Sequence, residues 1–314
     1  MILEKTNEDK FVAKGICCGD EKIFADAVIL ATGHSATDIY QMLNNVAIKN
    51  KIDVAKILEE KTFAVGVRVE HPRTVIDKIQ YHGKERTENL PAAEYRLTTQ
   101  VDERGVYSFC MCPGGLVVPS SSSPEEIVVN GMSPSSRNSK WSNSAIVVEV
   151  RPEDAKEILK DNNITLENSE LASLKFRTYL EKLTYQNGNG IKAPAQKLSD
   201  FINGEETKSF PETSYTPGLI SSRLDLWLPD FIKTRLQKAF KKFNENMKGF
   251  ICEDAILIAS ETRTSTPLRI LRDKETLQNP VIKNLFPAGE GSGYSGGIVS
   301  SAMDGENVAK KICN

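Results

Sequence analysis

The sequence predicts an α/β protein in which a sheet of the nucleotide-binding type is interrupted by a second, mixed domain. Near both ends of the 314-residue chain, apolar strand patterns stop at glycine turns and helical patterns follow. Between these ends, short strands alternate with longer helices. A chain that leaves a sheet, builds another domain and returns has this order. We expect the sheet domain to comprise residues 1–45 and 255–314, and the second domain residues 46–254.

The composition is typical of a folded protein and argues against nucleic acid and membranes as binding partners. Apolar residues make up 39% and charged residues 26% of the chain, which argues against global disorder. The formal net charge is −2 without a long basic block, so neither nucleic acid nor a membrane is the expected partner. No apolar run approaches the ~20 residues that span a bilayer, and the N-terminus does not resemble a signal peptide. We therefore expect a cytoplasmic protein.

The first strand that ends at a glycine turn lies near the N-terminus. Strands are expected at 11–14 and 21–30, and the second ends in an apolar run typical of a buried parallel strand. The run stops at Thr32-Gly33, and residues 35–38 resemble a capping box that opens a helix through about Leu43. Both a ligand-facing backbone edge and an ordinary strand-to-helix connection fit this pattern.

The middle of the chain combines strands with helices. Alternating residues predict a strand over 63–69, and Pro72 is suited to the first turn of a helix. The Ser- and Asn-rich segment 132–143 is typical of a surface loop that lines a site. Further strands are expected at 105–110, 116–119, 127–130, 145–150 and 255–259, and helices at 51–60, 72–80, 151–160, 169–186, 195–202 and 229–247.

The most distinctive stretch is Pro287–Gly297, Pro-Ala-Gly-Glu-Gly-Ser-Gly-Tyr-Ser-Gly-Gly. It follows a short apolar run and precedes small and apolar residues at helical spacing, so strand, turn and helix are expected. Glycines leave the backbone free of Cβ atoms, and the N-terminus of the following helix favours an anion. The stretch therefore indicates a phosphate or pyrophosphate cradle, although a tight strand-to-helix connection would fit the glycines as well.

Several co-linear stretches together resemble one protein family. They are Ala27–Ser35, Phe63–Pro72, Val106–Gly115 and Glu261–Pro267, with Asn130–Met132, Lys192–Gln196 and Leu285–Gly297 in addition. Over nearly the whole chain they resemble the bacterial FAD-dependent dehydrogenases, flavoproteins with the glutathione-reductase type of FAD domain. The resemblance implies a partial FAD/NAD(P)-binding Rossmann-like domain, interrupted by an α+β substrate or cap domain.

One part of that family pattern is not found in this sequence. Members begin with a strand, a Gly-x-Gly-x-x-Gly turn and a helix that hold the ADP half of FAD. The first 25 residues here contain only Gly15 and Gly19. We therefore expect the chain to correspond to the C-terminal portion of a member, and to bind little FAD by itself.

The resemblance also assigns residues to the cofactor. Glu290 would face the ribityl chain of FAD, where a carboxylate accepts hydroxyl hydrogen bonds. The glycines on both sides of it would let the backbone approach pyrophosphate and isoalloxazine, and the helix from about Ser295 would stabilise negative charge at the flavin N1/O2 edge. An exposed carboxylate and purely structural glycines are the alternatives. The expected FAD-contacting residues are Thr32, Gly33, Gly289, Glu290, Gly291, Gly293, Gly296, Gly297 and Ile298.

Catalytic candidates are few. Cys110 and Cys112 form a Cys-x-Cys pair on one face of an expected strand, which suits redox or sulfur-transfer chemistry if a nearby cation lowers a thiol pKa. Structural packing is the alternative, and no second pair gives metal-ligand spacing. His34, beside the first glycine turn, is a candidate acid or base. Three arginines could bind an anion or form salt bridges: Arg137, Arg263 and Arg269.

Two functions fit the sequence. The first is the C-terminal part of a FAD-dependent oxidoreductase, which passes a hydride between flavin N5 and a small-molecule substrate or NAD(P)H. The second is a ligand-binding or assembly module that has a flavoprotein fold without turnover. The glycine-rich stretch favours the first, and the missing Gly-x-Gly-x-x-Gly turn favours the second.

Overall fold

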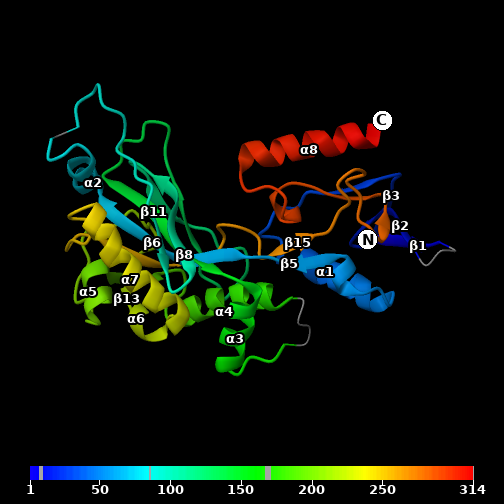
Figure 1. The fold of residues 1–314 in the computed structure, drawn as a ribbon, viewed down its shortest axis with the longest axis horizontal. Helices are drawn as coiled ribbons and strands as arrows, with labels where there is room; N and C mark the ends of the chain where they lie inside the picture. The colour runs from blue at the N-terminus through cyan, green and yellow to red at the C-terminus, as the bar shows by residue number, and fades with distance from the viewer. Residues whose placement is uncertain (7–9, 85, 167–170, 314) are drawn as a thin grey trace. The chain divides into compact units, whose positions relative to one another are not determined.

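The structure is a computed structural model that describes residues 1–6, 10–84, 86–166 and 171–313. The chain forms two compact units (Figure 1). Unit 1 comprises Met1–Phe63, Arg151–Lys175 and Ser265–Asn314, and unit 2 comprises Ala64–Val150 and Phe176–Thr264. Both contain strands and helices, which confirms the predicted α/β class. The Rossmann-like arrangement stays a prediction.

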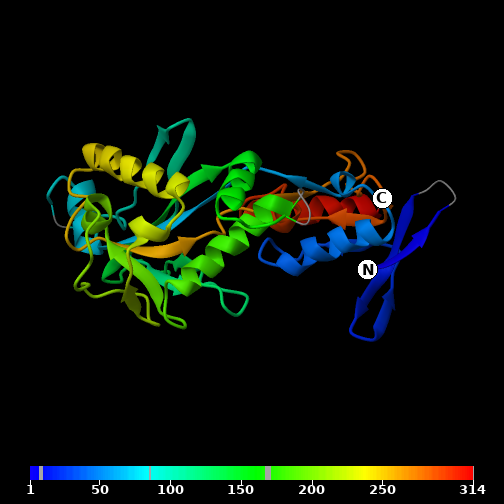
Figure 2. The ribbon, with the colours of Figure 1, turned by 90° about the horizontal axis from the view of Figure 1, so that it is seen from below.

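Unit 1 contains short sheets that join the beginning of the chain to its end. Its strands are β1 (Ile2–Lys5), β2 (Phe11–Cys18), β3 (Glu21–Phe24), β4 (Val28–Leu30), β5 (Leu58–Glu60), β15 (Leu268–Ile270), β16 (Ile282–Lys283) and β17 (Leu285–Pro287). Strands β1 to β3 form an antiparallel ribbon, dark blue in Figure 2. Strand β16 pairs in parallel with β2, and β17 pairs in parallel with β4. The β4–β17 pair brings the two expected glycine turns to one sheet edge.

The described part of unit 1 also contains helices and 3-10 turns. They are α1 (Thr37–Lys49), α3 (Pro152–Asp161), α8 (Ile298–Cys313), η1 (Val54–Lys56) and η3 (Glu290–Ser292). Helix α1 buries Tyr40, Leu43 and Ala47 in a core that includes Leu58 and Leu268.

The structure corrects two local predictions in unit 1. No capping box forms at 35–38, because α1 has Ala36 at its N-cap position without a side-chain hydrogen bond, and it continues to Lys49. The helix expected at 51–60 is replaced by η1 and β5. Strand β5 pairs with β15, more than 200 residues away, so a long-range sheet contact outweighs local helix preference.

Unit 2 is built on a seven-stranded mixed sheet in the order β13-β12-β14-β6-β11-β8-β7. In chain order these are β6 (Phe63–Pro72), β7 (Thr98–Val101), β8 (Arg104–Cys112), β11 (Trp141–Val150), β12 (Ala193–Lys197), β13 (Leu219–Ser221) and β14 (Ile256–Glu261). A separate hairpin pairs β9 (Leu116–Pro119) with β10 (Val129–Met132). The described helices are α2 (Arg73–Gln80), α5 (Leu198–Asn203), α6 (Leu224–Trp227) and α7 (Asp230–Asn246), together with α4 (Ala172–Gln186), which begins in unit 1 and continues into unit 2 from Phe176.

Central strand β6 carries three buried polar residues that can bear a charge. It lies between β14 and β11, and Phe63 to His71 are all buried, so the predicted alternation does not give it a solvent face. A Cβ atom at Gly66 would collide with the Ile146 carbonyl of β11. Arg68, Glu70 and His71 are therefore held inside the sheet layer by close packing on both sides.

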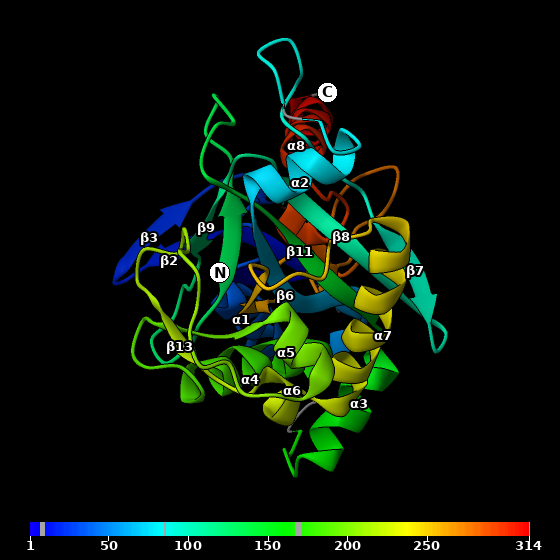
Figure 3. The ribbon, with the colours of Figure 1, turned by 90° about the vertical axis from the view of Figure 1, so that its left-hand side faces the viewer.

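Helix α7 packs against β7, β8 and β11, as Figure 3 shows. Its buried residues include Ile232, Leu236 and Phe240, which confirms the predicted apolar face. No helix among the described residues is long and apolar enough to cross a membrane.

The two units divide the chain at different places from the expected domains. Residues 46–63 and 151–175 belong to unit 1, whereas 255–264 belong to unit 2. Ile57, Leu58 and Leu174 lie in the core that also holds α1, which explains where the first two segments pack. The FAD-binding and substrate-binding roles assigned to the domains stay predictions.

Candidate functional site

Two glycine turns meet at one edge of the parallel pair β4–β17 in unit 1. Leu30 lies opposite Pro287, so the chain leaves both strands at the same end. The amide of Ala288 donates to the Leu30 carbonyl at 3.0 Å. A Cβ atom at Gly291 would lie 2.6 Å from the Gly33 carbonyl oxygen. The structure therefore brings together the two turns that the sequence singled out separately.

The glycines of these turns differ in what surrounds them. Gly291 and Gly293 are buried, and a Cβ at Gly293 would lie 2.9 Å from the backbone of β15. By contrast, a Cβ at Gly33 or Gly296 would meet no atom within 4 Å, and at Gly297 the nearest lies at 3.8 Å. Packing accounts for the first two glycines. Open space in front of the others leaves room for a ligand near the backbone.

Glu290 lies in η3 between these glycines and is partly buried. Its Oε1 atom is 3.8 Å from Nε2 of His34, and the two side chains are 29% and 15% exposed. Burial raises the pKa of Glu290, and the nearby ammonium of Lys61 offsets part of this rise. Burial, together with Arg269, lowers the pKa of Lys61. Glu290 is thus a sheltered carboxylate that can accept hydrogen bonds from hydroxyl groups.

Side chains from neighbouring elements hold the turn in place. The Tyr40 hydroxyl donates to the Gly291 carbonyl at 2.8 Å. Asp304 of α8 accepts the Gly289 amide at 2.8 Å and pairs with Arg272 at 2.6 Å. Burial raises the pKa of Asp304, but the Arg272 and Gly289 hydrogen bonds outweigh burial and lower it overall. The turn is therefore anchored on both sides of Glu290.

Helix α8 begins at Ile298, three residues later than expected. Ile298 is 92% exposed, and Val299 and Met303 are exposed as well. Val308 is the one α8 residue in the described part that is buried. The start of the helix lies open beside Gly296 and Gly297, and the exposed Thr32 lies on the neighbouring turn.

A buried arginine forms the polar centre of unit 2. The guanidinium of Arg68 donates to Glu261 Oε2 at 2.8 Å, to Asn143 Oδ1 at 2.6 Å and to Asn130 Oδ1 at 3.2 Å. It also donates to the Cys110 carbonyl at 3.3 Å. Although burial disfavours the charge, Glu261 raises the pKa of Arg68 overall. This charged group links β6, β8, β10, β11 and β14, which include four of the stretches that carry the resemblance.

The glycine of Asn130-Gly131-Met132 has a structural explanation. A Cβ atom at Gly131 would collide with Nη1 of Arg68. A Cβ atom at Gly115 would likewise lie only 2.7 Å from the Cβ atom of Cys112. These glycines make room for the guanidinium and for the turn that follows β8.

The two cysteines of the Cys-x-Cys pair lie in different environments, which corrects the expectation of one shared face. Cys110 is exposed and has φ +43°, whereas Cys112 is buried. The strand register shifts opposite this segment, so simple alternation breaks there. Cys112 donates its thiol to the Cys110 carbonyl at 3.3 Å, and its sulfur lies 3.9 Å from Arg68. Cys110 lines a cavity of about 690 Å³ together with Tyr95 and Tyr107.

Two of the three arginines considered as anion ligands form ion pairs with protein carboxylates. Arg263 is buried and pairs with Glu181 at 3.1 Å. Arg269 pairs with Glu59 at 2.8 Å. Arg137 is exposed and accepts a hydrogen bond from Arg86 through its carbonyl. Among the described residues, no cluster of three or more His, Cys, Asp or Glu side chains could hold a metal.

Sequence reasoning missed several residues that organise these sites. Arg68, Tyr40 and Lys61 were not singled out. For Arg68 a signal existed, because a charge within the apolar strand 63–69 is expected to have a buried partner.

Comparison with known protein families decides the family. Residues 62–264 match the family described as "FAD-dependent protein, C-terminal domain-like", which is more than half of the chain. The chain belongs to this family of FAD-dependent proteins. The match confirms the resemblance at the level of a flavoprotein family, and the dehydrogenase assignment stays a prediction. The matched segment includes all of unit 2 and the inserted residues 151–175.

A relative from Clostridium beijerinckii supports the same grouping. This protein, described as uncharacterized, is 39% identical over 315 residues, which is 99% of this chain. The aligned region is 56% of the relative's length, so the chain spans little more than half of it.

Proposed function

We propose that this chain is part of a FAD-dependent oxidoreductase, in which unit 1 contacts FAD and unit 2 serves as the substrate domain. The observation that carries the proposal is the meeting of the Gly33 and Glu290 turns at the carboxyl ends of the parallel strands β4 and β17. In open α/β sheets, ligands bind at this end of the strands.

The residues at this edge fit the chemistry of a flavin nucleotide. Glu290 would accept hydrogen bonds from ribityl hydroxyls, since a carboxylate is a strong acceptor. The backbone at Gly33 and Gly296 faces open space, and the start of α8 at Ile298 would favour negative charge. Bound FAD would supply hydride transfer, while the protein supplies position and electrostatics.

Candidate groups for proton or thiol chemistry lie in both units. In unit 1, His34 could hold a proton at Nε2 beside Glu290. In unit 2, the exposed Cys110 lines its cavity, and Arg68 donates to the Cys110 carbonyl and so holds this end of β8 in place. We propose Cys110 as the reactive cysteine and Cys112 as a positioning residue.

The proposal is tested by titrating the purified chain with FAD and following flavin absorbance and fluorescence. We expect weak but saturable binding that Gly296→Ala reduces at least tenfold, because the added methyl group would occupy the ligand's space. Gly305→Ala is the matched control, since a Cβ there also meets no atom within 4 Å but lies inside α8. Its FAD affinity should equal that of the parent chain.

An unsaturable titration would contradict the proposal and favour a flavoprotein-like module without turnover. Equal loss of affinity in both glycine variants would contradict the assigned position of FAD. Melting temperatures of the variants report whether each is folded.

A further inference from the structure

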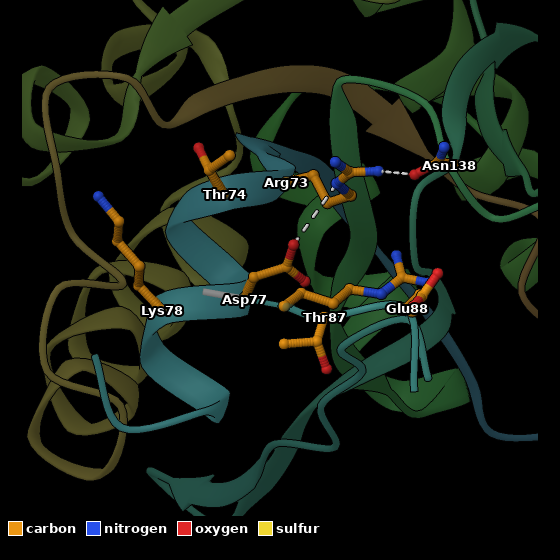
Figure 4. Close-up of a pocket in the computed structure, with 8 residues that line it drawn as sticks. Arg73, Thr74, Asp77, Lys78, Thr87, Glu88 and Asn138 are labelled. Carbon is orange, nitrogen blue, oxygen red and sulfur yellow. Dashed lines mark hydrogen bonds and ion pairs between the residues drawn. The ribbon is translucent and has the colours of Figure 1, made fainter. Parts of the chain in front are cut away.

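Unit 2 contains a second cavity that the proposed function does not use. Its volume is about 490 Å³, and the side chains that line it are all charged or polar (Figure 4). Helix α2 supplies Arg73, Asp77 and Lys78 on one side. The segment after α2 supplies Arg86 and Glu88 on the other. A cavity of this composition is suited to a small polar ligand rather than an apolar one.

The balance of charge in the cavity favours an anion. Three cationic side chains face two carboxylates. One carboxylate, Asp77, is already paired with Arg73, with Nε and Oδ2 3.5 Å apart. Arg86 donates to the Leu90 and Arg137 carbonyls, which orient the guanidinium without neutralising its charge. Lys78 is exposed and has no ion pair within the part of the chain that the structure describes.

The buried carboxylate of Asp77 at this cavity can accept a further hydrogen bond. The Asp77 side chain is only 6% exposed, and its Oδ1 atom accepts no hydrogen bond of normal geometry from the described residues. Burial raises the pKa of Asp77, while Arg73, Arg86 and the nearby Ala93 amide lower it in part. A buried polar atom without a partner is costly, so a ligand group that donates to Oδ1 would be stabilised.

We propose that this cavity binds a small organic acid that carries a hydroxyl or amino donor next to a carboxylate. The carboxylate of the ligand would lie against Arg86 and Lys78, and its donor would meet Asp77. Arginine and lysine both bind carboxylates, and guanidinium does so in a bidentate way. A phosphate dianion fits less well, because it concentrates two negative charges on one group beside Asp77 and Glu88, whereas the charges of a dicarboxylate lie on separate groups.

Malate and succinate are suitable probes, since these dicarboxylates differ by one hydroxyl group. We expect calorimetric titration of the chain near pH 7 to show saturable malate binding, about tenfold tighter than succinate, because only malate carries a hydroxyl group that can donate a hydrogen bond to the carboxylate of Asp77. Inorganic phosphate should bind more weakly than malate. Binding of phosphate as tight as malate would overturn the proposal, as would equal binding of malate and succinate.

Substitutions of the residues that line the cavity test whether malate binds there. Arg86→Gln should weaken malate binding at least tenfold, and Asp77→Asn should bring the affinities for malate and succinate together. Lys208→Gln is the matched control, because this exposed lysine of unit 2 does not line the cavity, and it should leave the affinity unchanged. If Asp77→Asn does not fold, the exposed Lys78→Gln takes its place and should weaken both acids. Equal effects of Arg86→Gln and Lys208→Gln, or no saturable binding, would refute the site.

Discussion

Arg68 carries a positive charge in the buried centre of the unit 2 sheet. Its guanidinium is fully buried and bonded to side chains of three other strands. Removing one partner of a buried ion pair leaves the other charge uncompensated. The effect of Arg68 on stability is therefore measured as the decrease in the free energy of unfolding when Arg68 is replaced.

We predict that Arg68→Met destabilises the protein by about 3–5 kcal/mol, because Glu261 would stay buried without its partner. The measurement is urea unfolding followed by circular dichroism. Arg269→Gln is the control, since its ion pair with Glu59 is exposed and contributes about 0–1 kcal/mol. Similar losses in the two variants would contradict the central role of Arg68.

His71 makes stability depend on pH. Burial lowers the pKa of His71 to about 4, and the ring donates from Nε2 to the Phe250 carbonyl at 2.7 Å. The unfolded chain takes up this proton near pH 6.5, whereas the folded chain resists it until about pH 4. Stability from this group is therefore present above pH 6.5 and declines as the pH falls to about 4.

We predict a loss on the order of 3 kcal/mol from this group between those pH values. Chemical denaturation at a series of pH values measures it. His71→Gln should remove this part of the pH dependence, and an unchanged profile in that variant would show that other groups cause it.

At the scale of elements, the parallel pair β4–β17 depends on the close contact of Gly291 with Gly33. We predict that Gly291→Ala costs about 1–3 kcal/mol, because its methyl group must push the Gly33 backbone aside. Gly305→Ala, inside α8, should instead gain about 0.5–1 kcal/mol. Thermal unfolding compares the two, and a neutral Gly291→Ala would mean that the turns separate easily.

The spacing of apolar residues correctly predicted helices such as α7, whose hydrogen bonds join residues that are close in the sequence. The apolar face of α7 was visible in the spacing of Ile232, Leu236 and Phe240. The helix expected at 51–60 failed because β5 exists only through its pairing with β15. The partners of Arg68 could not be predicted, because Asn130, Asn143 and Glu261 meet only once the sheet has formed.

At the scale of the whole molecule, each unit has a core of its own. Leu43, Leu58 and Leu285 share a cluster in unit 1, while Val129 and Ile258 share another in unit 2. Proteins with more than one domain often depart from two-state unfolding. We predict that scanning calorimetry gives a van't Hoff enthalpy below the calorimetric enthalpy. Equal enthalpies would instead show that the units unfold together.

The division of unit 1 into three chain segments has a consequence for synthesis on the ribosome. Unit 2 is complete at Thr264, whereas unit 1 needs residues 265–314, including β17. Domains generally fold as units while the chain emerges. Unit 2, although nested within unit 1 in the sequence, can therefore fold first, and β4 must wait without its strand partner until β17 leaves the exit tunnel.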